Sequence, residues 1–122
     1  MAISVPATRE ALANAYSALG AYISLHTGNP GTTGANEATG GSPAYARKQT
    51  TWATGDASDG VETGSQVTFD VPAGTYTHVG IGSAATGGTF IDSYKIPGTP
   101  NDAGIVMSVQ GQVRVTPTYT QS

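Results

Sequence analysis

The first hydrophobic pattern along the chain has the period of a helix. Leu12, Tyr16 and Leu19 recur at i, i+4 and i+7. Small apolar residues fill the same side, namely Ala11, Ala15 and Ala18. The pattern predicts one helix over residues 8–19, which must pack on something through this side because a helix of about twelve residues is marginal alone.

The residues around this segment supply start and stop signals. Thr8 is expected to act as the N-cap, and Glu10 would lie near the positive end of the helix dipole. Gly20 offers a left-handed C-terminal stop. Residues 1–6 then precede the helix as a candidate N-terminal arm.

After Gly20 the pattern changes to the period of two that is typical of strands. In the first segment Ile23 and Leu25 alternate with Ser24 and His26. Residues 67–71 and 75–83 flank the turn Pro72–Thr75, which predicts a hairpin. In the last segment Gly111 falls on the apolar side, which predicts a bulge or a close backbone approach there. Strands are expected over residues 21–26, 45–53, 67–71, 75–83, 89–96 and 105–115.

The connections between the expected strands are polar and rich in Gly, Pro and Thr. Thr27–Pro43 is predicted to be a long loop or extended arm, a length at which loops are usually functional or intermolecular. A second polar loop is expected over Thr54–Gly64, and Pro97–Ala103 breaks the chain again. We therefore predict a mainly β fold over residues 1–122, an antiparallel β-sandwich or small barrel with one N-terminal α-helix.

Composition narrows the function classes. The chain of 122 residues contains 17 Gly and 7 Pro, too many for a helical bundle. Its net charge is −3 with five basic residues, which argues against nucleic-acid binding. It has no Cys, hence no disulfide or thiolate metal site. No apolar run is long enough to span a membrane and no signal peptide is visible, so no membrane partner is expected.

Several short motifs resemble cofactor or metal sites, but the residues around them do not fit those functions. Gly80–Ala85 matches the G-x-G-x-x-A dinucleotide pattern, but another strand rather than a helix is expected to follow. Asp56–Gly60 resembles part of a calcium loop, but Glu62 is too close to serve as its last ligand. His26 and His78 lack metal-ligand spacing, so they are expected to be surface or interface histidines.

An enzyme is not expected. No nucleophile elbow occurs, nothing pairs a Ser with a base, and the acidic residues are scattered singly. We accordingly predict no catalytic residue, no cofactor and no metal. The six tyrosines and Trp52 could form a binding face, although packing in strands also explains them. The candidate partner-interface residues are Trp52, Tyr45, Tyr22, His26, Asn29 and Asn36.

The stretch Ile23–Arg47 resembles a family of small virion proteins of tailed bacteriophages. It carries "SLHT" from Ser24, "PGTTGANE" from Pro30, "GGS" from Gly40 and "YAR" from Tyr45. Val67–Thr75, Val79–Gly80 and Ser83–Phe90 are also similar to that family. This chain departs from the pattern by the inserted Pro43–Ala44 and by Gly28, both in a loop.

The resemblance implies a structural component of the virion without cofactor or catalysis. Our main expectation is a capsid decoration (minor capsid) protein that binds the major capsid protein and copies of itself, a trimer being one option. Met1–Pro6 and Thr27–Pro43 are the candidate arms for these contacts. The first alternative is a minor tail or tail-fibre protein that recognises host surface carbohydrate through exposed tyrosines. The second is a wall-degrading hydrolase.

Overall fold

The computed structural model describes residues 4–53, 61–96 and 104–120 of the chain. Its central sheet has the strand order β2-β1-β7-β8, and all neighbouring strands run antiparallel. These strands span Tyr22–His26 (β1), Lys48–Gln49 (β2), His78–Gly82 (β7) and Phe90–Lys95 (β8). A β-bulge at Ile81/Gly82 shifts the register between β7 and β8.

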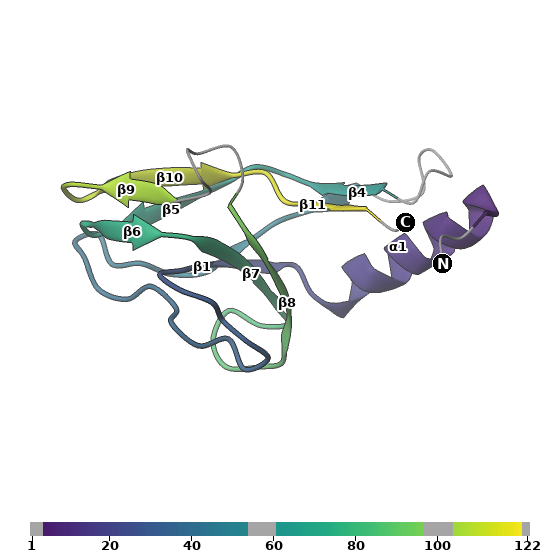
Figure 1. The fold of residues 1–122 in the computed structure, drawn as a ribbon, viewed down its shortest axis with the longest axis horizontal. Coiled ribbons are helices and arrows are strands. Elements are labelled where there is room, and N and C mark those ends of the chain that lie inside the picture. The colour runs from purple at the N-terminus through teal and green to yellow at the C-terminus, as the bar shows by residue number, and fades with distance from the viewer. Residues whose placement is uncertain (1–3, 54–60, 97–103, 121–122) are drawn as a thin grey trace.

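Shorter sheets cover one face of this central sheet (Figure 1). Strand β5 (Val67–Val71) pairs with β10 (Gly111–Val115), and β6 (Gly74–Tyr76) pairs with β9 (Ile105–Met107). Toward the helix, β4 (Val61–Gly64) lies between β3 (Trp52–Ala53) and β11 (Thr118–Thr120). The described strands do not close into a barrel, so the predicted mainly β, antiparallel sandwich with one N-terminal helix is confirmed.

The hydrophobic core lies between the central sheet and β5/β10. Ile23 and Leu25 of β1 and Phe69 of β5 are fully buried there. Alternate residues of β5 are buried, as the period of two predicts. The remaining buried members of this cluster are Ala38, Val67, Val71, Tyr76, Val79, Ile81 and Val113.

The predicted hairpin between residues 67–71 and 75–83 is wrong. Strand β5 pairs with β10, while the following segment divides into β6 and β7, which join different sheets. The chain crosses over at Pro72–Tyr76, where the Tyr76 hydroxyl donates to the Pro72 carbonyl at 2.7 Å. At Thr77 the backbone N–H donates to the His26 carbonyl, which fixes β7 beside β1.

Other predicted strands are shorter than expected. Residues 45–53 contain only β2 and β3, and residues 105–115 are interrupted by a bend at 108–110, so Gly111 begins β10 instead of bulging from a longer strand. Val61–Gly64 is a strand although it was expected to be loop, and β11 was not foreseen. The turn expected at 97–103, the candidate calcium segment 56–60 and residues 1–3 of the candidate arm lie outside the described residues.

The helix α1 spans Pro6–Leu19 and lies at the end of the molecule where both termini are found (Figure 1). It begins two residues earlier than predicted, so Pro6 belongs to the helix and not to an arm. Val5 occupies the N-cap position and no side chain caps the helix, which makes the expected Thr8 cap wrong. Gly20 is extended, with φ −177°, and therefore provides no left-handed stop.

The helix packs mainly through residues outside the predicted apolar side, of which Tyr16 alone among the three large residues contacts the body. Glu10, Ala13 and Ser17 are buried, whereas Leu12 and Leu19 remain 44% and 57% exposed. The Asn14 amide donates to Glu10 Oε2 at 3.1 Å and to Glu62 Oε1 of β4. Tyr16 fixes the helix laterally, since its ring stacks on that of Tyr119 at 3.7 Å between centroids. The helix is therefore held on the body by hydrogen bonds and an aromatic stack, and not by its leucines.

Candidate functional site

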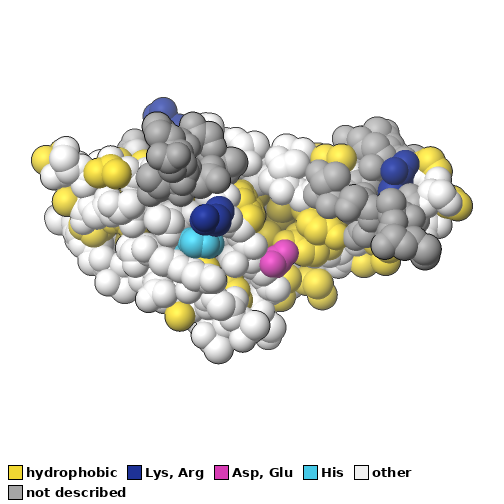
Figure 2. All heavy atoms as spheres, in the orientation of Figure 1, with side chains coloured by type: hydrophobic (Ala, Val, Ile, Leu, Met, Phe, Trp, Pro, Cys, Tyr) yellow, Lys and Arg dark blue, Asp and Glu magenta, His cyan; other side chains and the backbone are white. Residues whose placement is uncertain are grey.

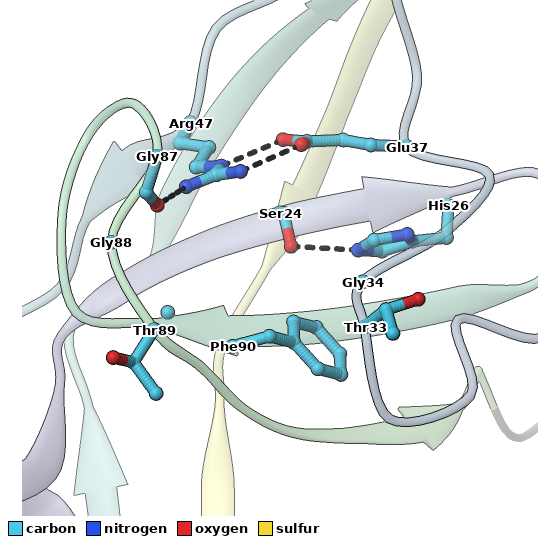
Figure 3. A pocket seen from close by; sticks show the side chains of 11 residues that line it. Ser24, His26, Thr33, Gly34, Glu37, Arg47, Gly87, Gly88, Thr89 and Phe90 are labelled. Atoms are coloured by element: carbon cyan, nitrogen blue, oxygen red, sulfur yellow. Dashed lines mark hydrogen bonds and ion pairs between the residues drawn. The ribbon is translucent and has the colours of Figure 1, made fainter.

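A small polar pocket lies on the outer face of the central sheet, away from the core. Two connections cover this face, the β1–β2 connection (residues 27–47) and the β7–β8 connection (residues 83–89). The pocket between them has a volume of about 160 Å³ (Figure 3). Its lining residues are Ser24, His26, Thr33, Gly34, Glu37, Arg47, Gly82, Gly87, Gly88, Thr89 and Phe90.

The β1–β2 connection folds back along β1 and is not an extended arm. The Thr27 N–H donates to the Asn36 carbonyl, and the Ala38 N–H donates to the Leu25 carbonyl. His26 and Glu37 form an antiparallel bridge between these two bonds. Because this segment covers the outer face of β1, Ser24 and His26 are buried although they alternate with the core residues.

Ser24 and His26 form a hydrogen-bonded pair in the pocket. The distance from Ser24 Oγ to His26 Nε2 is 2.8 Å, and His26 Nδ1 lies 2.8 Å from the Ala35 carbonyl oxygen. A carbonyl can only accept, so Nδ1 carries the proton and Nε2 of the neutral ring accepts from the Ser24 hydroxyl. Burial lowers the pKa of His26 below its usual 6.5, which keeps the ring neutral at pH 7.

Gly80 makes room for this pair. It lies opposite Ser24 in the register of β1 and β7. A Cβ atom at Gly80 would come within 2.5 Å of Ser24 Oγ, 2.6 Å of His26 Nε2 and 2.9 Å of Phe90 Cε1. The glycine at this position is therefore required by the close approach of three side chains.

Arg47 joins the two connections beside the pocket, because it forms an ion pair within the β1–β2 connection and donates to carbonyls of the β7–β8 connection. Arg47 donates to both carboxylate oxygens of Glu37, from Nε at 2.8 Å and from Nη2 at 2.9 Å. Its Nη1 donates to the carbonyl oxygens of Ala84 and Gly87, each at 3.0 Å. The Tyr45 hydroxyl completes the arrangement by donating to Glu37 Oε2 at 2.9 Å. We call Glu37, Tyr45 and Arg47 the clasp.

The clasp is charged on both sides. Burial alone would raise the pKa of Glu37, but the hydrogen bonds from Arg47 and Tyr45 outweigh it and lower that pKa below its usual value. The hydrogen bond to Glu37 raises the pKa of Arg47. Bidentate pairs between charged groups are among the stronger hydrogen-bonded contacts, so Glu37 holds the Arg47 guanidinium in place. The bonds from Arg47 Nη1 to the Ala84 and Gly87 carbonyls then tie the two connections together.

The chemistry left for a ligand is that of hydroxyl groups and an aromatic ring. The polar atoms of the clasp and the Ser24–His26 pair already bond within the protein. Thr33 and Thr89 line the pocket and are exposed, and the Phe90 ring lies between these two threonines in the view of Figure 3. Within the part of the chain that the structure describes, no group of His, Asp and Glu could hold a metal ion.

The predicted interface residues do not form one surface. His26 and Tyr45 lie at the site, but His26 is 1% exposed, so its predicted surface or interface position is wrong. Asn29 and Asn36 are exposed and bond to the backbone of their own loop. Tyr22 is half-buried. Trp52 lies elsewhere, where its Nε1 donates to the Gly20 carbonyl at 2.9 Å.

Sequence patterns did not point to Ser24, Glu37 or Arg47 as site residues. The expectation that nothing pairs a Ser with a base is wrong, since Ser24 and His26 lie two residues apart on one strand and share a face. That spacing was a usable signal. Glu37 and Arg47 gave no comparable signal, because their pairing depends on how the loop folds back.

None of the six tyrosines is exposed, and the Tyr76 side chain is buried in the core. The face of exposed tyrosines considered for carbohydrate binding is therefore absent. His78 is half-buried, with Nδ1 2.9 Å from Thr77 Oγ1. The Gly80–Ala85 motif leads into a loop and then β8, as expected. The described part of the chain has no helix long and apolar enough to cross a membrane.

Fold and site together define a small β-sandwich whose outer sheet face carries two clasped loops. Residues 11–98 match the family model Gp80, which is described as podophage GP4 fiber I protein gp80. The match covers well over half of the chain, so the protein belongs to this family. It is a bacteriophage structural protein and a component of the virion. No curated protein and no solved structure matches the chain.

Proposed function

We propose that the protein is a subunit of a tail fibre of the phage virion. The observation that carries this proposal is the family match over residues 11–98, because the matching family is described as a fiber protein. The same match favours the tail-fibre alternative over our main expectation of a capsid decoration protein. In this proposal the partners of the chain are other tail proteins, not the major capsid lattice.

We propose further that the loop surface beside the clasp contacts host surface carbohydrate. Residues 27–36 and 83–89 contain no charged residue and are rich in Thr, Gly and Asn. Hydroxyl and amide groups of this kind can exchange hydrogen bonds with the hydroxyls of a neutral sugar. The clasp holds both loops in place before binding, which reduces the entropy lost when a ligand orders them.

Immunogold labelling of intact virions tests the fibre assignment. An antibody against this chain is applied to purified phage, and an antibody against the major capsid protein serves as the control for labelling of the head. Gold confined to the tail or to fibres attached to it is the expected result. Gold spread evenly over the head would overturn the proposal and restore capsid decoration.

Binding to polysaccharide extracted from the host surface tests the second proposal. We expect the purified protein to bind in titration calorimetry, and a Thr33→Lys, Thr89→Lys variant to lose at least tenfold in affinity. Thr75→Lys is the matched control, since Thr75 is also an exposed threonine but lies on β6, away from the loops. Absence of binding, or equal losses in both variants, would contradict a role of the loop surface in carbohydrate recognition.

A further inference from the structure

The pocket beside the clasp is too small to enclose a whole saccharide. Its volume is about 160 Å³, whereas pockets that enclose a drug-sized ligand measure about 300–1,000 Å³. A chain of sugars would therefore lie on the two loops, and only one substituent of a sugar ring could enter the pocket. The chemistry of the pocket walls indicates which substituent fits.

The pocket and the loops around it favour an uncharged group. Glu37 and Arg47 line the pocket, but their charges are already paired with each other. Burial keeps the His26 ring neutral at pH 7. Figure 2 shows no charged side chain on the lower part of the molecule, where the two connections lie in Figure 1. A carboxylate, phosphate or ammonium group would lose hydration there without gaining an unpaired opposite charge.

Two threonine hydroxyls supply polar contacts for a ligand. Thr33 belongs to the β1–β2 connection and Thr89 to the β7–β8 connection, and both residues line the pocket and are exposed. Neither hydroxyl takes part in the clasp or in the Ser24–His26 pair, so each can exchange its contacts with water for contacts with a ligand. A hydroxyl can donate one hydrogen bond and accept others. The two threonines therefore suit a group that offers one acceptor and one donor.

The Phe90 ring supplies an apolar wall beside these hydroxyls. It is half-buried and meets the His26 ring edge-on, with 5.9 Å between the ring centroids. Glycine at position 34 leaves the ring uncovered, because a Cβ there would lie 3.0 Å from Phe90 Cδ1. Gly34 and Phe90 both line the pocket. An uncovered aromatic ring next to two hydroxyls suits a ligand group in which a methyl adjoins polar atoms.

We infer that the pocket binds the acetamido group of an N-acetylated amino sugar in the host surface carbohydrate. One threonine hydroxyl donates to the acetamido carbonyl, the other accepts from its N–H, and the methyl contacts Phe90. A hydroxyl substituent would leave the ring uncovered, and an O-acetyl ester has no donor, so neither matches all three features of the wall. The inference rests on the proposed function, since it specifies which carbohydrate the loop surface recognises.

Titration of the full chain, labelled with ¹⁵N, tests the inference by nuclear magnetic resonance. The probes are the methyl glycosides of N-acetylglucosamine and of glucose, which differ only in the acetamido group. We expect the N-acetylated probe to shift the backbone amide signals of Gly34 and Gly88 and to bind about fivefold more tightly, roughly the gain from burying one methyl group. Equal affinity for the two probes, or shifts confined to residues away from the pocket, would overturn the inference.

A variant that narrows the pocket provides the second measurement. Gly82 lines the pocket, and a Cβ there would lie 3.7 Å from Arg47 Nη1 and from the Thr89 carbonyl oxygen, which are ordinary contacts. Gly82→Ala should therefore keep the fold, as circular dichroism can verify, and lower the affinity for the N-acetylated probe by about fivefold. Ala85→Val is the matched control, because it adds methyl groups to an exposed residue of the same connection outside the lining. Equal affinities of the two variants would contradict the inference.

Titration of Gly82→Ala with the host polysaccharide separates this inference from the proposed function. If the variant binds the polysaccharide less tightly than the unchanged chain does, both are supported. If the two bind it equally, the loop surface recognises carbohydrate and the acetamido inference is wrong. Binding of the N-acetylated probe at the pocket without binding of the polysaccharide would support the inferred pocket chemistry and contradict the host surface as the source of the ligand.

Discussion

The outer face of the central sheet and the helix α1 differ in whether their side chains find partners within the chain. On the sheet face, polar groups that would otherwise be buried without partners are paired with each other, as in the clasp and the Ser24–His26 pair. On α1 the polar groups face the body, while Leu12 and Leu19 face water. The polar groups of the sheet face find their hydrogen-bond partners within the chain, whereas the leucines of α1 stay exposed to water.

The difference separates two uses of a surface. Pairing of polar groups within the chain makes a rigid platform, because an unpaired buried group would carry a substantial free-energy cost. An apolar side that stays exposed gains no free energy from burial within the chain. The sheet face is therefore suited to display loops.

The largest effect is expected from filling the space at Gly80. Gly80→Ala places a Cβ against Ser24, His26 and Phe90 and should lower the free energy of unfolding by about 3 kcal/mol. Urea unfolding followed by circular dichroism measures this. Gly82→Ala is the matched control on the same strand, where the nearest atom is 3.7 Å from the new Cβ, and it should change stability by less than about 1 kcal/mol. Equal effects would mean that the outer face is not closely packed.

Weakening the clasp should have the next largest effect. Arg47→Lys keeps the charge but cannot reproduce the two bonds to Glu37 together with those to Ala84 and Gly87. We expect a loss of about 2 kcal/mol in the free energy of unfolding. Lys48→Arg, the reverse exchange at the neighbouring position, should alter it by less than about 0.5 kcal/mol. If both exchanges were neutral, the clasp would not hold the loops.

Trp52 lies at the junction of the two regions, because its Nε1 bonds to the carbonyl of Gly20 directly after α1. Trp52→Phe keeps an aromatic ring and removes this donor, which should cost about 1 kcal/mol in thermal unfolding. Trp52→Tyr serves as the comparison variant, because its hydroxyl is also a donor but stands at a different place from the Trp52 Nε1 that bonds the Gly20 carbonyl. A loss confined to the amide protection of α1 in hydrogen exchange would sharpen the contrast between helix and sheet.

The smallest effect is expected from pH. Burial lowers the pKa of His26 in the folded protein, so below about pH 6.5 the unfolded chain binds a proton more readily. Stability from this residue is present above pH 6.5 and is lost as the pH falls toward the lowered pKa. His26→Gln should reduce the fall in stability between pH 7.5 and pH 5.5. A slope unchanged by the substitution would assign the pH dependence to another group, since the lowered pKa of Glu37 acts only near and below its usual 4.5.

The sequence predicted those elements whose burial follows their own period. Strand β5 lies where alternation placed it, and the mainly β class with one helix is correct. The pairing of strands could not be predicted, because the crossover at Pro72–Tyr76 resembles a hairpin turn in sequence. The orientation of α1 was wrong for a different reason. Periodicity identifies the apolar side of a helix but not what that side contacts, and here Leu12 and Leu19 stay exposed while Tyr16 contacts the body.

The candidate site could be predicted only in part. His26 was singled out from the sequence, yet its burial depends on residues 27–38 folding back along β1. Tyr45 was also singled out, but its role appears only with Glu37 and Arg47, whose side chains meet through tertiary structure. Contacts between a loop and a distant loop, such as Arg47 with Gly87, leave no periodic trace in a sequence.

The clasp also has a consequence for variation of the protein. Its anchoring atoms all lie near the bases of the two loops, at residues 37, 45, 47, 84 and 87. At the tip of the first loop, Thr32 and Thr33 are exposed. Residues at the tips can therefore be exchanged or inserted at small cost, because loop-closure entropy rises only slowly with length. We therefore expect substitutions and insertions to be tolerated at the loop tips and not at the clasp residues.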